Sequence, residues 1–269
     1  MSKKRVLFVT QEMNPYTVVS EISELVRKLT PYVQSKGLEI RVLMPKFGLI
    51  NERRHRLHEV VRLSGMNIIV DDDDYPLIIK VASLPGARMQ VYFLDNEEFF
   101  KRKEVFEDKD GKAFKDNQER MIFFCKGALE TVKKFGWSPD LVHCHGWLTA
   151  LVPLYLKKVY NEDPIFADSK VIYTVYKDTF ESDFSAKFID QAAINNLTTD
   201  DLKPFKKGSK IKLHEGGIHY ADAIVKGSEK LLKGVQNVIG ERDVPVLEYS
   251  EIEDMPSACL QFYRQLLEE

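Results

Sequence analysis

Two histidines separated by one residue, His143 and His145, are the first side chains in this sequence whose spacing suggests chemistry. They flank Cys144 at the end of an apolar run, 140–144, so in a strand both imidazoles face one side of the backbone and the thiol faces the other. Imidazole and thiolate are zinc ligands, but no Asp or Glu follows closely to complete a ligand set. We therefore favour a buried His143 bonded to backbone, with His145 at the rim of a cleft, over a metal site.

Two polar residues, Glu12 and Asn14, follow the first apolar run of the chain, residues 5–10. Ligands in open α/β sheets bind beyond the carboxyl ends of the strands. If residues 5–10 form such a strand, Glu12 and Asn14 stand where an acceptor could be held. Both are therefore candidate substrate-binding residues.

Two other polar clusters are predicted to be structural rather than chemical. Asp71 to Asp74 form an acidic run without a second acidic cluster or a calcium-ligand spacing, so we expect a solvated turn rather than a cation site. His214, Glu215 and His219 fall on a predicted helix, where histidines at i and i+5 are poorly placed to share a ligand, and we expect a solvated face. The sequence thus predicts neither a metal site nor a cofactor.

Apolar runs alternate with helical periods at the start of the chain, as in parallel strands joined by helices. Residues 5–10 resemble a strand covered on both faces, and a helical period follows over 18–33. Gly37 sits where a helix C-cap would fall, and a second apolar run, 40–44, is closed by Pro45. This opening predicts an α/β fold with a doubly wound, mostly parallel, Rossmann-like sheet.

Between residues 55 and 94 the pattern changes to short alternating strands, which predicts an antiparallel insertion. The expected strands are 57–63, 67–70, 77–84 and 89–94. Beyond the insertion the alternation of strands and helices resumes. The expected elements are helices 117–135 and 147–160, strands 140–144, 170–176, 223–225 and 244–249, short helices within 185–220, and an amphipathic helix at 258–267. Because no repeat, linker or composition break is present, we expect a single domain over 1–269.

Composition limits the partners. Among 269 residues, Lys plus Arg number 39 and Asp plus Glu 41, so the net charge is −2 and no basic excess is present to neutralise nucleic acid. The mean hydropathy is −0.28, and no apolar stretch approaches the roughly 20 residues that cross a bilayer. We therefore expect neither a nucleic-acid nor a membrane partner, and a cytoplasmic location. Three cysteines, an odd number without regular spacing, fit reduced thiols.

Four groups of residues carry motifs that recur together in one family. They are Pro45-Lys46-Phe47-Gly48-Leu49-Ile50, the run from Phe106 to Ala128-Leu129-Glu130 that includes Asp116-Asn117 and Glu119-Arg120, His143-Cys144-His145-Gly146-Trp147-Leu148-Thr149-Ala150-Leu151-Val152-Pro153, and Gly216-Gly217-Ile218 with Tyr220-Ala221-Asp222. In this order they resemble the N-terminal half of ADP-glucose-dependent glycogen and bacterial starch synthases, retaining glycosyltransferases of the two-lobed GT-B fold. The resemblance covers about residues 4–230 and implies one GT-B lobe, on which the helix at 258–267 packs back.

The departures from the family's pattern bear on function. The family's Lys-x-Gly-Gly loop after the first strand, which holds the donor's phosphates, is replaced here by residues 15–20, Pro-Tyr-Thr-Val-Val-Ser. Gly146 stands where the family has Asp, Leu148 where it has a second His, and Tyr176-Lys177 where it has His-Asn. Each change removes a polar group that would stabilise charge during transfer, so no residue is assigned a catalytic role.

The resemblance also implies where a ligand would lie. Tyr16, Tyr176 and Lys177 are expected to fill the vacated donor site. Trp147 could stack on a sugar or pack in the core, and the sequence favours neither. The space in question is bordered by Thr10, Tyr16, His145 and Tyr176. The candidate substrate-binding residues are therefore Glu12, Asn14, Tyr16, His145, Trp147 and Tyr176.

A GT-B transferase needs two lobes, and 269 residues suffice for one. The resemblance therefore predicts a glycogen synthase-related protein of α-glucan metabolism without glucosyl transfer on its own, which binds α-glucan or a partner protein of glycogen metabolism or forms a homo-oligomer. Aromatic candidates for a glucan surface are Tyr92, Phe99, Phe100 and Trp137, with core packing as the default for all four. Two alternatives stay open: a transferase of glucose from ADP-glucose to an α-1,4-glucan, active with a separate C-terminal lobe, and a small α/β sugar- or nucleotide-binding protein.

Overall fold

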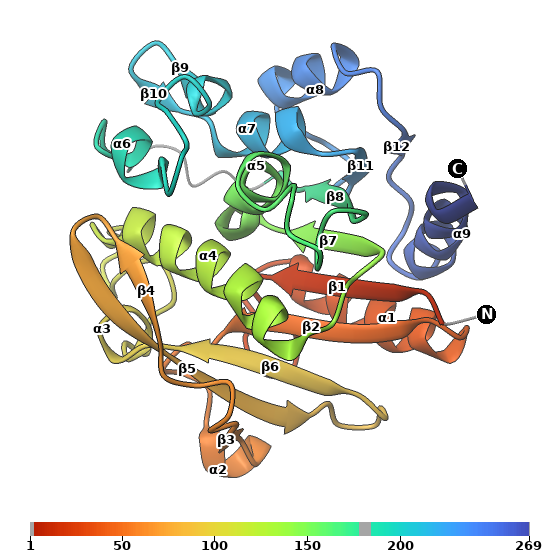
Figure 1. Cartoon of the computed structure of the whole chain (residues 1–269). Helices are drawn as coiled ribbons and strands as arrows, with labels where there is room; N and C mark the ends of the chain where they lie inside the picture. Colours follow the sequence, from red (N-terminus) through yellow and green to blue (C-terminus); the bar gives the residue numbers. More distant parts are fainter. Residues whose placement is uncertain (1–2, 178–183, 269) are drawn as a thin grey trace.

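A mixed sheet of ten strands forms the centre of the part of the chain that the computed structural model describes, residues 3–177 and 184–268 (Figure 1). The strands lie in the order β12-β11-β8-β7-β1-β2-β6-β5-β3, and β4 pairs with β5. Their bounds are β1 Arg5–Thr10, β2 Glu39–Pro45, β3 His58–Glu59, β4 Met66–Val70, β5 Asp73–Ser83, β6 Gln90–Asp95, β7 Leu141–His145, β8 Lys170–Val175, β11 Ala223–Lys226 and β12 Val246–Leu247. A separate two-stranded ribbon pairs β9 Lys206–Lys207 with β10 Lys210–Ile211.

Helices cover both faces of this sheet (Figure 1). They are α1 Ile22–Ser35, α2 Glu52–His55, α3 Glu97–Phe100, α4 Asn117–Phe135, α5 Leu151–Lys158, α6 Phe188–Ala192, α7 Leu213–Tyr220, α8 Lys233–Gly240 and α9 Met255–Glu268, with 3-10 turns η1 Trp147–Thr149 and η3 Lys203–Phe205. Helices α1 and α9 lie side by side on one face, whereas α4, α5 and α7 lie on the other. The predicted fold class, a doubly wound and mostly parallel α/β sheet, is confirmed.

Strand β1 shows why the sequence builds a two-sided core. Val6 and Phe8 pack on the face that α1 and α9 cover, Leu7 and Val9 pack on the opposite face, and all four are fully buried. Side chains alternate between the two faces of a strand, so a central parallel strand is apolar at successive positions. β1 pairs in parallel with β2 on one side and β7 on the other, which places it in the middle of the sheet.

The first helix begins at Ile22 and not, as the periodicity predicts, at residue 18. Val18 and Val19 instead lie exposed in the loop between β1 and α1. The carboxylate of Glu12 accepts the backbone N–H groups of Val19 and Ser20. These amides are held by a side chain from the end of β1, and the helix starts only after them.

The antiparallel insertion is confirmed for β3, β4 and β5, which pair around β5. The last predicted strand of the insertion, β6, also joins β2 in parallel and so belongs to the central sheet. The predicted strand 57–63 shortens to β3 because the chain turns back, with the N–H groups of Leu63 and Ser64 donating to the carbonyl of Val60. Asp71 lies in the turn between β4 and β5, with φ of 57°.

Two elements near the C-terminal end differ in length from the prediction. β12 covers only Val246–Leu247, whereas α9 is longer than the predicted 258–267 and runs over Met255–Glu268. The predicted helix 147–160 is divided into η1 and α5. None of the helices in the described part combines the length and the apolar character of a membrane span.

Candidate functional site

The carboxyl ends of three neighbouring strands, β1, β7 and β8, meet at one edge of the sheet. The strand register pairs Thr10 with His145, and His145 with Thr174. Tyr176 directly follows β8. The structure therefore brings together three of the four residues expected to border one space, Thr10, His145 and Tyr176, whose exposed fractions are 0%, 0% and 2%. All three side chains are therefore buried within the protein.

His143 lies deeper in the sheet and is fully buried. Its Nδ1 lies 2.5 Å from Tyr263 Oη, and its Nε2 lies 2.6 Å from Thr174 Oγ1. The predicted backbone partner is therefore wrong, because both partners are side-chain hydroxyls and one of them comes from α9. Burial, reinforced by the neighbouring His145, lowers the pKa of His143 well below its usual value, so the imidazole is neutral at pH 7.

His145 is also fully buried, so its predicted place at a cleft rim is wrong. The ring of Phe8 stacks on it, with the two centroids 5.9 Å apart. Its Nδ1 lies 2.8 Å from Tyr176 Oη, while its Nε2 has no hydrogen-bond partner among the described residues. Burial lowers the pKa of His145 to about 3. Because His143 and His145 have ring centroids only 4.0 Å apart, two neutral rings avoid like-charge repulsion.

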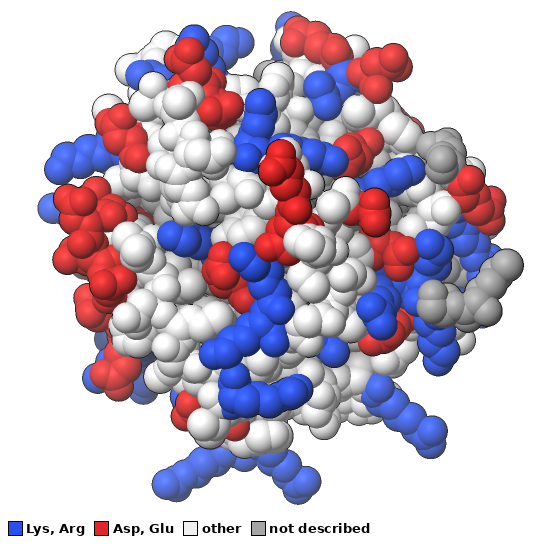
Figure 2. Space-filling view, viewed as in Figure 1, with Lys and Arg blue, Asp and Glu red and all other residues white. Residues whose placement is uncertain are grey.

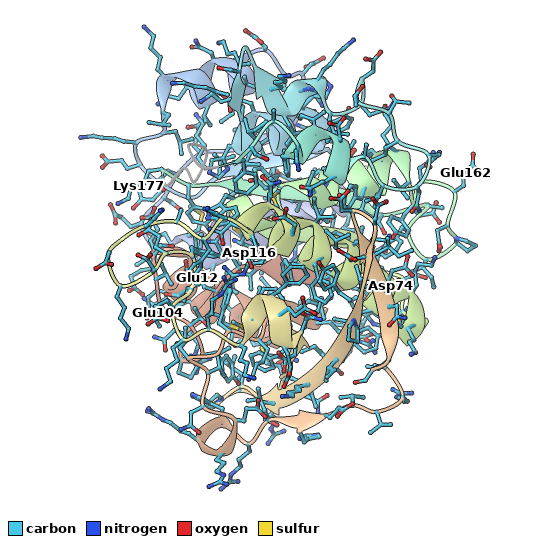
Figure 3. All side chains as sticks on the ribbon, turned by 90° about the vertical axis from the view of Figure 1, so that its left-hand side faces the viewer. Glu12, Asp74, Glu104, Asp116, Glu162 and Lys177 are labelled. Carbon is cyan, nitrogen blue, oxygen red and sulfur yellow. The ribbon has the colours of Figure 1, made fainter. Side chains whose placement is uncertain are left out.

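Glu12 is fully buried, and its carboxylate already has partners inside the protein (Figure 3). Its Oε2 accepts the N–H groups of Val19 and Ser20 at 2.6 and 2.9 Å, and its Oε1 accepts the Ser20 hydroxyl at 2.6 Å. Burial raises the pKa of Glu12, and these hydrogen bonds oppose that rise. Asn14 is half-buried, and its side-chain amide donates to Glu24 on α1. Both candidate acceptor residues therefore hold the loop between β1 and α1.

Tyr16 belongs to the same loop but turns toward other strands. Its ring packs edge-on against Phe93 at 4.8 Å and against His55 at 5.0 Å, measured between centroids. Its hydroxyl donates to the carbonyl of Ser83 at 3.1 Å. Desolvation raises the pKa of Tyr16 to about 12, so the phenol stays protonated. Tyr16 thus fixes the loop to β5 and β6.

Lys177 is exposed and lies at the edge of the molecule (Figure 3). Its backbone N–H donates to Ser228 Oγ at 3.0 Å. Of the three residues expected to fill the donor site, only Tyr176 contacts His145, and the described contacts of Tyr16 and Lys177 lie elsewhere.

Trp147 is a core residue. It is 3% exposed, and its ring centroid lies 4.8 Å from that of Phe106 and 5.8 Å from that of Phe184. Of the two alternatives, stacking on a sugar or packing in the core, the structure shows packing in the core. The preceding Gly146 has φ of 88°, and a Cβ at this position would lie 2.2 Å from Gln11 Oε1. The Gln11 side chain thus occupies the space beside Gly146 and would have to move to admit a Cβ.

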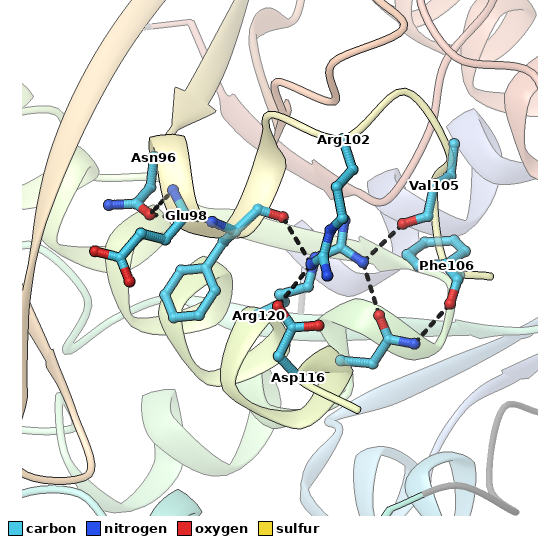
Figure 4. Close-up of polar contacts among 9 residues, drawn as sticks. Asn96, Glu98, Arg102, Val105, Phe106, Asp116 and Arg120 are labelled. Atoms are coloured by element: carbon cyan, nitrogen blue, oxygen red, sulfur yellow. Dashed lines mark hydrogen bonds and ion pairs between the residues drawn. The ribbon is translucent and has the colours of Figure 1, made fainter. Parts of the chain in front are cut away.

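Arg120 of α4 is 1% exposed and anchors the loop between α3 and α4 (Figure 4). Its Nη1 donates to Val105 O and to Asn117 Oδ1, each at 2.7 Å. Its guanidinium lies 5.4 to 6.0 Å from the ring centroids of Phe47, Phe100, Phe106 and Phe114. Burial, with the nearby Arg102, lowers the pKa of Arg120 to about 9, so it remains charged at pH 7. Arg102 itself pairs with Asp116 at 2.6 Å (Figure 4).

The three cysteines and His214 lie in the core, whereas His219 is exposed as predicted. Burial raises the pKa of the thiols of Cys125, Cys144 and Cys259. His214 is buried, not solvated as predicted, and its Nδ1 lies 2.9 Å from Tyr173 Oη because α7 packs against β8. Within residues 3–177 and 184–268, no three His, Cys, Asp or Glu side chains form a group that could hold a metal ion.

Sequence reasoning missed Thr174 and Tyr263, which contact His143, and Gln11, which lies beside Glu12 and Gly146. Gln11 directly precedes Glu12 and could have been included with it. Thr174 lies on β8 beside the strand of the two histidines, a place that only the strand order reveals. Tyr263 is separated from His143 by 120 positions, and no local signal connects the two.

A mostly parallel sheet, helices on both faces and polar side chains at the carboxyl ends of the strands make a doubly wound α/β architecture. This is the architecture of one lobe of the GT-B fold. Residues 5–244 match the family described as starch synthase catalytic domain, and the chain belongs to this family. Over 94% of this chain and 53% of the other, it superimposes with a TM-score of 0.75 and 19% identity on a structure titled as the catalytic domain of starch synthase IV from Arabidopsis thaliana bound to ADP and acarbose.

Several curated relatives that match the sequence are glycogen synthases. The chain is 35% identical over 231 residues to glycogen synthase of Chlorobaculum tepidum, covering 84% of this chain and 46% of the relative. It is 41% identical over 173 residues to glycogen synthase of Chlorobium limicola, covering 64% of this chain and 35% of the relative. The chain therefore spans about a third to a half of the length of these relatives. The resemblance to the N-terminal part of glycogen and starch synthases is confirmed.

Proposed function

We propose that this glycogen synthase-related chain acts in α-glucan metabolism by binding α-glucan or a partner protein, and does not transfer glucose by itself. The observation that carries the proposal is the burial and mutual contact of two polar side chains, His145 and Tyr176, at the carboxyl ends of β7 and β8. His145 and Tyr176 contact each other there at 2.8 Å, and neither is more than 2% exposed. A sugar or phosphate group would have to displace both side chains.

The loop between β1 and α1 supports the same proposal. Backbone amides that precede a helix are common ligands for phosphate groups. Here the amides of Val19 and Ser20 are bound by the carboxylate of Glu12. A nucleotide phosphate would have to compete with this internal anion and would meet its negative charge at close range.

The test is incubation of the purified chain with glycogen and radiolabelled ADP-glucose. Glycogen synthase of Chlorobaculum tepidum, a relative at 35% identity, serves as the positive control. We expect the chain to incorporate no more label than a reaction without protein. Incorporation above that background by the homogeneous chain would overturn the proposal.

Burial of the aromatic candidates favours a protein partner over a glucan surface. Phe99, Phe100 and Trp137 are 4%, 0% and 3% exposed, which confirms the default of core packing, and Tyr92 is half-buried. Stacking on a pyranose needs an exposed ring face, which Phe99, Phe100 and Trp137 do not offer. Electrophoresis in gels with and without glycogen distinguishes the two roles. We expect equal migration, whereas retardation by glycogen would assign the α-glucan role instead.

One observation favours a second function, transfer of glucose from ADP-glucose to an α-1,4-glucan in complex with a separate lobe. Four apolar side chains on the loops after β1, β2 and β11 are exposed at the carboxyl edge of the sheet, by 40% to 59%: Val18, Val19, Leu49 and Leu232. A docked lobe would cover such side chains. The isolated C-terminal lobe of a related glycogen synthase, added to the chain, tests this function. Incorporation of label by the mixture, and by neither part alone, would support this second function. If the mixture incorporates no label, the function is excluded for that lobe.

A further inference from the structure

A hollow of about 520 Å³ lies against α2, away from the carboxyl ends of β1, β7 and β8. Its lining residues are Arg54, His55, Arg56, His58, Ser83 and Pro85. Every ionisable side chain in this lining is an arginine or a histidine. Figure 2 shows Lys and Arg side chains gathered at the bottom of the view, where Figure 1 places α2 and β3.

The positive charge of this hollow is not compensated within the protein. Arg54, Arg56 and His58 are exposed, and none of the ion pairs or hydrogen bonds among residues 3–177 and 184–268 uses their side chains. Glu52, the carboxylate of α2, is already paired with Lys46 at 2.6 Å and with Lys80 at 2.7 Å.

The charge is also concentrated in the sequence. Residues 53–62 contain four arginines, two histidines and one glutamate, in a chain with 39 basic and 41 acidic residues. Such a segregated cluster raises the local concentration of anions.

Arg56 occupies a backbone conformation that disfavours arginine. It ends α2 with φ of 54° and ψ of 42°, the left-handed region in which helix ends usually have Gly or Asn. Strained residues of this kind are found preferentially at ligand sites. The strain therefore agrees with a binding role for the Arg56 side chain.

The walls of the hollow are fixed by neighbouring contacts. Asn51 caps α2 by accepting the N–H of Arg54 at 2.9 Å. The half-buried ring of His55 packs against Tyr16 at 5.0 Å, and the hydroxyl of Tyr16 donates to the Ser83 carbonyl. Two residues of the lining are thus held by one buried tyrosine.

We propose that this hollow binds a phosphate monoester of a small sugar or polyol. Guanidinium groups bind phosphate oxygens through paired N–H donors, and Arg54 and Arg56 offer two such groups beside two imidazoles. The volume of the hollow falls in the range of small-molecule sites. This inference goes beyond the proposed function, because it does not depend on whether the chain transfers glucose.

The test follows the six histidines of the full chain by NMR during titration with glycerol 3-phosphate at constant ionic strength. Glycerol and sodium sulfate serve as matched probes without the phosphate ester. We expect glycerol 3-phosphate to shift the signals of His55 and His58 and to leave those of the buried His143, His145 and His214 unchanged. The proposal would be overturned if glycerol or sulfate shifted the signals of His55 and His58 as much as glycerol 3-phosphate does. It would also be overturned if glycerol 3-phosphate caused no shift.

Substitutions then locate the site. Arg54→Ala and Arg56→Gly should each weaken binding by about tenfold or more, because each removes a charge-assisted contact. Arg53→Ala is the matched control, since Arg53 is an exposed arginine of the same helix that does not line the hollow, and it should change affinity by less than about twofold. An equal loss in Arg53→Ala would indicate a diffuse basic surface and would overturn the proposal.

Discussion

The hydroxyl of Tyr176 lies 2.8 Å from Nδ1 of His145, deep at the carboxyl end of the central strands. Tyr176→Phe would leave this buried nitrogen without its partner. We expect the free energy of unfolding to fall by about 1 to 3 kcal/mol, the cost of an unsatisfied buried polar group. Urea unfolding followed by circular dichroism measures the change. The control is Tyr32→Phe, at a half-buried tyrosine of α1, which should change the free energy of unfolding little. An equally small change for Tyr176→Phe would contradict the hydrogen bond between Tyr176 and His145.

Acidification should destabilise the protein through the buried histidine pair. The pKa of His145 is lowered to about 3 and that of His143 is lowered as well, so the unfolded chain, with pKa values near 6.5, takes up protons first. The contribution of the two histidines to the free energy of unfolding is complete above about pH 6.5. It is lost as the pH falls below this value, by up to about 1.4 kcal/mol per pH unit for each histidine. Denaturant unfolding at about pH 7 and pH 5.5 measures this slope.

His145→Gln separates this effect from other titrating groups. Glu12, whose pKa is raised, contributes with the opposite sign, but it is present in both proteins and cancels in the comparison. We expect a shallower loss of stability on acidification in the variant. Equal slopes in the two proteins would show that His145 is not the neutral buried group that the structure indicates.

Gly146 should not tolerate even a methyl group. Its φ of 88° and the 2.2 Å approach of a Cβ to Gln11 Oε1 lead us to expect that Gly146→Ala costs about 2 to 4 kcal/mol, from overpacking and left-handed strain together. The double variant Gly146→Ala with Gln11→Ala should recover part of this loss, because the clash is removed and the strain remains. Thermal unfolding of both variants provides the measurement, and no recovery would contradict the clash.

Arg56→Gly should stabilise the protein while it weakens the proposed phosphate site. Glycine adopts the left-handed conformation at the end of α2 without the cost that arginine incurs, so we expect a gain of about 1 kcal/mol. Denaturant unfolding tests this gain independently of any ligand. Arg53→Gly, within the helix, should instead lower stability.

Local patterns were sufficient to predict most of the fold. Helix α4 matches its predicted bounds, and β1 matches as well, because burial on both faces makes a strand apolar at successive positions. The start of α1 could not be predicted, since it depends on a carboxylate from the end of β1.

The site was harder to predict than the fold. The sequence located the edge where Thr10, His145 and Tyr176 meet, because parallel strands end on one side of a sheet. It did not show that these side chains are buried, because burial of His145 depends on Phe8 and on neighbouring strands distant in sequence. The prediction that His214 is solvated was wrong for the same reason, since its partner Tyr173 lies on β8, which is distant in sequence.

The contact between His143 and Tyr263 also has a consequence for synthesis on the ribosome. The imidazole in the middle of the sheet obtains one of its two partners only after residue 263 has emerged, when strands β1, β7 and β8 have long been translated. A nascent chain that has not yet released α9 carries an incompletely bonded centre and an uncovered sheet face beside α1. The bonding of His143 and the covering of this sheet face are therefore complete only after α9 has emerged.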